Sequence, residues 1–210
     1  MTISPARRAE PLSLRKTVQG TVIVALSGFA KTEVEIAPGT TLRAIVNNIA
    51  GGVREGCDLK AVQVGGPWGG LIPVSNFDVA FDDTSLRAVG CSLGDGSLTA
   101  VDSRLCVVEL AQRAAAFAHG SICGECTFGR EGTRQLSDVL RDLTTGRGSV
   151  ADLELLKRVG EAMKVGSACI NGATAPEVVL TALEHFRAEF EAHAEAKQCP
   201  ANVCNCGKQK

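Results

Sequence analysis

The sequence predicts an α+β protein in which a β-rich first part is followed by a helical second part. Short apolar or alternating runs, separated by glycine and proline turns, fill 19–98, whereas apolar residues at helical spacing continue from 102 onward. A length of 210 residues suits one large or two small domains. We predict four parts: an N-terminal extension (1–17), a β-rich module (18–100), a helical bundle (101–196) and a cysteine-bearing tail (197–210).

The β-rich module begins with two predicted strands. The run 21–26 is apolar, which is typical of a buried strand, and 31–36 alternates between polar and apolar residues. A helix is expected over 41–50, because its apolar residues recur at helical spacing and two glycines follow it. The run 59–64 predicts a third strand, followed by the glycine-rich turn 65–70. Strand, strand, helix, strand is the order of a β-grasp (ubiquitin-like) module.

The second part predicts a four-helix bundle of short antiparallel neighbours. Apolar stripes over 105–118 and 133–143 indicate the first two helices. Capping signals at 149–152 and 174–177 place the starts of the third and fourth, which should extend to about 165 and 196.

Composition excludes several classes of function. The formal net charge is −1 and no basic run occurs, so we expect no nucleic acid among the partners. The apolar stretches are shorter than the roughly 18 residues of a membrane span, and no apolar signal segment follows the first residues. We therefore expect a cytoplasmic protein with no direct membrane span. Nine cysteines then indicate metal or redox chemistry rather than disulfides, because cytosolic thiols stay reduced.

Three cysteines suggest an iron–sulfur site. Cys123 and Cys126 form a C-x2-C at the start of a predicted helix, and Cys169 lies in a later loop. Thiolates suit iron because soft sulfur matches the metal, and a short C-x2-C presents two of them from one turn. A C-x2-C also occurs in zinc and dithiol sites, and Cys169 alone is equally consistent with a small buried apolar residue.

The runs 121–133, 167–176 and 185–193 resemble the C-terminal part of the flavoprotein subunit of respiratory complex I. They are similar in the same way to the corresponding subunits of NAD-linked and bifurcating hydrogenases and of formate dehydrogenases. Further similar runs resemble that subunit's soluble-ligand-binding (SLBB) β-grasp module; they are 25–29, 38–42, 51–53 and 60–67. The resemblance implies a β-grasp module and a bundle whose loops bind one [4Fe-4S] cluster, which passes electrons between FMN and further clusters.

Matched residue by residue, Cys123, Cys126 and Cys169 occupy the ligand positions, while Gly129 stands where the family has its third cysteine. Either the cluster persists, with one iron held by water, a side chain such as His119 or Glu125, or a partner's residue, or the site is vestigial and empty. The family also has a large FMN- and NADH-binding domain that the first 16 residues cannot supply. We therefore expect neither an FMN nor an NAD site.

The tail contains a second cysteine pattern. Cys199, Cys204 and Cys206 form C-x4-C-x-C, within the spacing range of structural zinc sites. Because zinc takes four sulfur or nitrogen ligands, we hypothesise a site built from Cys199, Cys204, Cys106 and either Cys206 or His193. The alternative is a flexible tail with exposed, reactive thiols.

The predicted function is that of an iron–sulfur electron-transfer and docking subunit of a multi-subunit NAD(H)-linked oxidoreductase, hydrogenase or formate dehydrogenase. Its partners would be flavin-type and ferredoxin-type subunits, and no bond-making catalysis is expected from the chain itself. The main alternative is a cluster-free structural or assembly subunit of such a complex. A further alternative is a β-grasp module that binds a small ligand at 65–70, although Trp68 there is better explained as a packing or interface residue.

Overall fold

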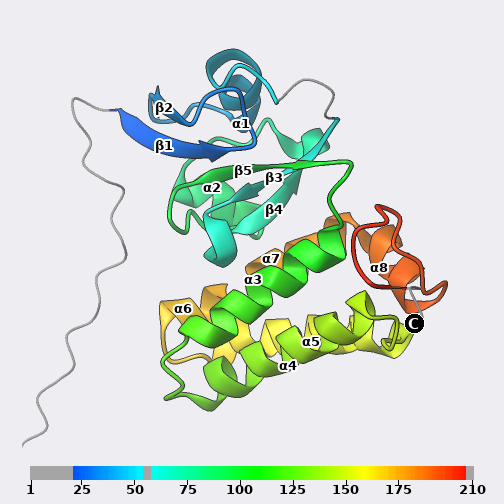
Figure 1. The fold of residues 1–210 in the computed structure, drawn as a ribbon. Coiled ribbons are helices and arrows are strands. Elements are labelled where there is room, and N and C mark those ends of the chain that lie inside the picture. Colours follow the sequence, from blue (N-terminus) through cyan, green and yellow to red (C-terminus); the bar gives the residue numbers. More distant parts are fainter. Residues whose placement is uncertain (1–20, 54–57, 207–210) are drawn as a thin grey trace, which may run out of the picture.

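The computed structural model describes residues 21–53 and 58–206. The predicted N-terminal extension and Cys57 lie outside this range. Within the described residues, a sheet region with its short helices packs on a region made of helices (Figure 1). The α+β prediction is confirmed. Among the described helices, none combines the length and the apolar character that crossing a membrane requires.

The sheet has five strands in the order β2-β1-β5-β3-β4. Their bounds are Val22–Ser27 (β1), Glu33–Ile36 (β2), Leu59–Val64 (β3), Gly70–Pro73 (β4) and Leu98–Asp102 (β5). β1 and β5 run parallel at the centre, and the other neighbouring pairs are antiparallel. The first three strands lie where the sequence predicts strands, whereas β4 and β5 are additional.

The helix expected over 41–50 is present in an unusual form. It begins as α1 (Leu42–Ala44), capped by the Thr41 side chain, and continues as a π-helix over Ile45–Ile49. Its apolar side chains, with those on one face of β1 and β2, form the core of the sheet region. A further helix, α2 (Asp83–Ala88), and 3-10 turns at Gly66–Trp68 and Val74–Asn76 complete this region.

Six helices make up the second region. They are α3 (Val107–Ser121), α4 (Thr127–Thr144), α5 (Val150–Gly166), α6 (Ile170–Thr174), α7 (Glu177–His185) and α8 (Arg187–Ala194). The first three correspond to predicted helices. The predicted continuous fourth helix was wrong: it is divided at Phe186, whose backbone (φ −125°, ψ 33°) leaves the α-helical region.

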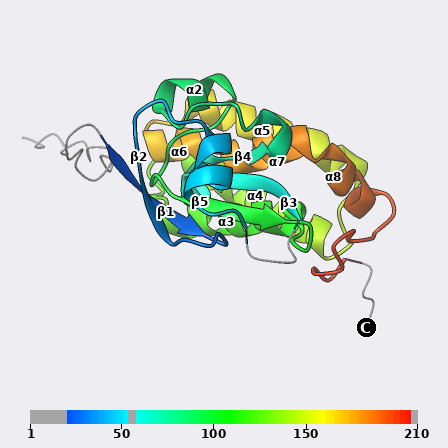
Figure 2. The same ribbon diagram turned by 90° about the horizontal axis from the view of Figure 1, so that it is seen from above.

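The helices cover one face of the sheet, so the two regions share a core. Ala61, Leu71 and Val101 of the sheet are buried with the apolar side chains of α3 to α8. The backbone N–H of Leu71 donates to Thr181 Oγ1 of α7 (2.9 Å). Trp68 packs edge-on against Phe117 of α3, with ring centroids 6.1 Å apart, which confirms its packing role. Seen from above, α8 and the tail lie at the end away from β1 and β2 (Figure 2).

Candidate functional site

The three cysteines of the predicted cluster site lie on two loops that meet at one end of the helical region. Cys126 is the N-cap residue of α4, and its Sγ accepts the N–H of Gly129 (3.3 Å). Cys169 is the N-cap residue of α6. The N–H of the preceding Ala168 also donates to Cys126 Sγ, and the bonds from Ala168 and Gly129 lower the pKa of Cys126. Cys126 is thus placed beside the Cys169 loop and favours the thiolate form that iron requires.

Glycines bring the backbone close at this point. A Cβ at Gly172 of α6 would lie only 3.6 Å from the Cα of Gly129, and one at Gly129 would lie 3.0 Å from Cys126 Sγ. Cys123 and Cys169 are exposed. The backbone donors and three thiols fit an iron–sulfur cluster, but position 129 carries no side chain to supply a fourth thiolate.

The structure also places the side chains considered as replacements for that thiolate. His119 Nδ1 lies 3.3 Å from Thr133 Oγ1, one helical turn beyond Gly129 on α4. Glu125 is exposed in the loop between the paired cysteines. Arg130 donates to the carbonyl of Gly124 (2.6 Å) and so ties the loop to the start of α4.

A second group of metal-ligating side chains forms where the tail returns to the bundle. The ligand atoms of Cys106, His193, Cys199 and Cys204 all lie within 4.8 Å of one another, and all four residues are buried. Cys106 is the N-cap residue of α3, and His193 lies in the last turn of α8. The group contains three sulfur ligands and one nitrogen, a composition of structural zinc sites.

The His193 ring is oriented for metal binding. Its Nδ1 lies 2.7 Å from the carbonyl oxygen of Glu189. Because a carbonyl only accepts, Nδ1 must carry the proton, and the unprotonated Nε2 faces Cys204 Sγ (3.2 Å) and Cys106 Sγ (3.4 Å). A hydrogen bond of this kind fixes the tautomer of metal-binding histidines.

The thiols of this group differ in acidity. Burial raises the pKa of Cys106 and of Cys204. Burial also acts to raise the pKa of Cys199, but backbone N–H donors from Cys204 and Val203 outweigh it and lower that pKa. Cys206 lies outside the group: its Sγ is 3.8 Å from the carbonyl of His193. Since the three tail thiols are buried, the alternative of exposed, reactive thiols was wrong.

Comparison with known proteins identifies the helical region. Residues 109–193 match the model of the NADH-ubiquinone oxidoreductase-F iron-sulfur binding region. The chain carries this iron–sulfur binding region. The match extends from α3 through α8 and includes Cys123, Cys126 and Cys169. The resemblance inferred from the sequence is therefore confirmed.

Relatives extend the similarity to most of the chain. The NADP-reducing hydrogenase subunit HndC of Solidesulfovibrio fructosivorans is 37% identical over 190 residues, which are 90% of this chain and 39% of that protein. An F-type NADH-quinone oxidoreductase subunit of Rhizobium meliloti (strain 1021) is 39% identical over 166 residues, 79% of this chain and 39% of the relative. The chain thus spans about two fifths of the length of these curated relatives.

Solved structures share the fold as well. A chain of the NAD+-reducing [NiFe]-hydrogenase in the H2-reduced state superposes with a TM-score of 0.73 at 26% identity, over 83% of this chain and 30% of that one. The air-oxidized state of the hydrogenase gives the same score over 82% of this chain.

An ion pair that the sequence did not predict joins the iron–sulfur binding region to the sheet. Lys60 of β3 donates to Glu189 Oε1 of α8 (2.6 Å) and to the carbonyl of Leu105 (3.0 Å). The other carboxylate oxygen of Glu189 accepts the N–H of Val107 at the start of α3 (3.2 Å). Sequence patterns gave no signal for this network, because Lys60 and Glu189 are far apart in the chain. It holds α8, and with it His193, against the start of α3.

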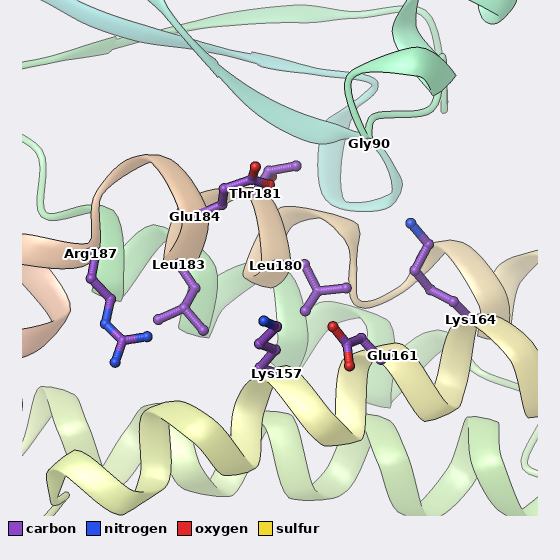
Figure 3. Close-up of a pocket in the computed structure, with 9 residues that line it drawn as sticks. All are labelled: Gly90, Lys157, Glu161, Lys164, Leu180, Thr181, Leu183, Glu184 and Arg187. Carbon is purple, nitrogen blue, oxygen red and sulfur yellow. The ribbon is translucent and has the colours of Figure 1, made fainter.

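A cavity of about 600 Å³ lies elsewhere, between α5, α7 and the loop at Gly90 (Figure 3). Lys157, Glu161 and Lys164 project into it from α5, opposite Leu180 and Thr181 of α7. Its lining includes neither Trp68 nor the glycines of 65–70. The cavity thus gives no support to the alternative of a ligand site at the glycine-rich turn.

Proposed function

We propose that the chain relays single electrons through an iron–sulfur cluster held by Cys123, Cys126 and Cys169. The observation that carries this proposal is the hydrogen bond from Ala168 to Cys126, which joins the two cysteine loops inside the matched iron–sulfur binding region. A cluster bound there would supply one-electron transfer. The chain would act as a subunit of an NAD(H)-linked oxidoreductase, hydrogenase or formate dehydrogenase.

The residues around the cysteines have separate roles in this proposal. N–H groups at the start of α4 and before α6 donate toward sulfur and favour a negatively charged group there. The exposed Cys123 and Cys169 leave the site accessible to a redox partner. Exposed apolar side chains at Phe128 and Ile170 next to the cysteine loops support docking of a protein at this end. We propose flavin-type and ferredoxin-type subunits as these partners, with FMN and NAD bound by the partners rather than by this chain.

The test is chemical analysis of the protein purified without oxygen in complex with its partners. We expect iron and acid-labile sulfide in similar amounts and an electron paramagnetic resonance (EPR) signal after reduction. Cys169→Ser should lower the iron content, whereas Cys91→Ser, a control at a buried thiol of the sheet region, should not. Absence of iron and sulfide from the folded complex would contradict the relay and favour a cluster-free structural subunit.

We further propose that Cys106, His193, Cys199 and Cys204 bind one structural zinc ion, which fastens the tail to the start of α3 and the end of α8. Their mutual distances, their burial and the orientation of the His193 ring support this assignment. Between the two candidates for the fourth ligand, the geometry favours His193 over Cys206.

Native mass spectrometry of the full chain tests the zinc proposal. We expect one zinc ion per chain, lost in Cys199→Ser and kept in the matched control Cys206→Ser. Removal of zinc with a chelator should also lower the melting temperature, because binding to the folded state alone adds stability. Equal zinc content in both variants, or no zinc in the unaltered chain, would overturn the assignment.

A further inference from the structure

Ser167 carries a buried hydroxyl that the fold leaves unused. Its Oγ is inaccessible to solvent, and no hydrogen-bond partner for it exists within the part of the chain that the structure describes. A buried hydroxyl without a partner costs about 1–3 kcal/mol, so native proteins rarely retain one without a reason such as a bound ion. The location of Ser167 suggests what this reason is.

Ser167 lies at the junction of the two cysteine loops. It caps the end of α5, precedes Cys169 by two residues, and is followed directly by Ala168, the donor to Cys126. Its Oγ faces Gly172, where a Cβ would lie 2.7 Å from that oxygen. The same Cβ would lie 3.6 Å from the Cα of Gly129. The unpartnered hydroxyl therefore lies next to the position at which the protein lacks a fourth thiolate.

We propose that Ser167 Oγ is the fourth protein ligand of the cluster, in place of the thiolate that Gly129 cannot supply. This rests on the proposed function. On binding, the O–H bond of the serine is replaced by an Fe–O bond, the proton passes to water, and no electron is transferred. An alkoxide oxygen is a harder ligand than a thiolate, so the iron that it binds is held less firmly than the three iron atoms bound by cysteine.

Two other side chains of this chain are less suited to the role. His119 already has a contact at Nδ1 with Thr133, which is one helical turn further along α4 than Gly129. Glu125 is exposed to solvent and has no need of a metal to satisfy its oxygens. Ser167 combines burial, an unpartnered oxygen and contact with the Gly129–Gly172 approach.

The experiment compares the full chain, purified with its partners under anaerobic conditions, with Ser167→Ala and the control Ser137→Ala. Ser137 is a buried hydroxyl further along α4, two helical turns beyond Gly129. In Ser167→Ala we expect iron to fall from about four to about three atoms per cluster, with the EPR signal of an oxidised three-iron cluster. Ser137→Ala should match the unaltered protein in both measurements.

A double variant separates loss of a ligand from damage to the fold. Gly129→Cys adds a thiol next to Cys126 and, combined with Ser167→Ala, should restore the four-iron cluster and abolish the three-iron signal. In the unaltered protein labelled with 57Fe, the Mössbauer spectrum should show one iron site distinct from the other three, because its ligand is oxygen.

The outcomes distinguish this proposal from the one on which it rests. A cluster that is present in the unaltered protein, and identical in iron content, EPR and Mössbauer spectra in Ser167→Ala, would overturn the ligand assignment alone. An unaltered protein without iron and sulfide would overturn the relay itself and Ser167 with it.

Discussion

Single residues join the parts of this molecule, and Glu189 is the main example. Its carboxylate binds Lys60 of the sheet and the first N–H of α3, while its carbonyl oxygen orients His193. The side chains of Lys60 and Glu189 are only 20% and 15% exposed, so water competes little for this ion pair. Removing one partner would leave the other charge poorly solvated.

We therefore predict that Glu189→Ala lowers the free energy of unfolding by about 2–3 kcal/mol. The matched control is Arg113→Ala, which breaks the exposed ion pair with Glu109 on α3 and should cost less than about 0.5 kcal/mol. Urea unfolding of both variants at pH 7 measures the two losses. Similar losses in the two variants would show that the Lys60 pair contributes no more than a surface pair.

The sequence revealed the candidate ligands unevenly. Cys123, Cys126 and Cys169 were recognisable from their spacing and from long similar runs. Cys106 and His193 were named as available ligands, but only the fold brings them together, since they lie on helices separated by most of the bundle. Ser167 was missed because a serine beside a cysteine has no distinctive pattern, and only its burial without a partner singles it out.

At the scale of elements, local signals predicted helix starts better than helix continuity. The capping box of α5 is present as expected: the N–H and the hydroxyl of Ser149 both donate to Asp152 Oδ2, at 2.6 and 3.0 Å. Helix four was predicted as one piece because its apolar residues keep helical spacing beyond Phe186. The break at Phe186 instead goes with tertiary contacts, since α7 packs on β4 while Lys60 of the sheet lies over the Phe186 ring (5.7 Å).

We predict that Asp152→Ala destabilises the protein by about 1 kcal/mol, because the Ser149 N–H and hydroxyl lose their common acceptor and the negative charge leaves the positive end of the α5 dipole. Glu161→Ala, an exposed carboxylate in the middle of the same helix, serves as the control and should change stability by less than about 0.5 kcal/mol. Thermal unfolding followed by circular dichroism compares the two. An equal effect at both positions would exclude a specific contribution from the capping box.

At the scale of the whole molecule, the packing of the helices on the sheet could be predicted only in part. Alternating and apolar runs located β1, β2 and β3, but β4 and β5 follow turn-rich sequence and went unnoticed. The shared core depends on which face of the sheet meets α3 and α7, and that choice is a tertiary property. Its clearest polar feature is Glu177, which is buried at the start of α7 near Ser92 of the sheet region.

Glu177 should make the stability of the whole molecule depend on pH. Burial raises its pKa from 4.5 to about 7, although Ser92, Lys164 and Arg87 act in the opposite direction. Between these values the folded protein keeps a proton that the unfolded chain has released. This contribution is therefore fully present below pH 4.5, is lost as the pH rises to about 7, and amounts to up to about 3 kcal/mol.

Glu177→Gln should remove this dependence, because a glutamine does not titrate. We predict that the free energy of unfolding of the variant, relative to that of the unaltered protein, rises between pH 4.5 and pH 8 by up to about 3 kcal/mol. Glu184→Gln, at an exposed carboxylate of the same helix, should show no such rise. Urea unfolding at closely spaced pH values measures the difference, and comparing slopes rather than absolute values removes any constant effect of the amide on packing. Parallel pH profiles for the Glu177→Gln variant and the unaltered protein would mean that this carboxylate is already ionised in the folded state, with Lys164 and Arg87 outweighing its burial.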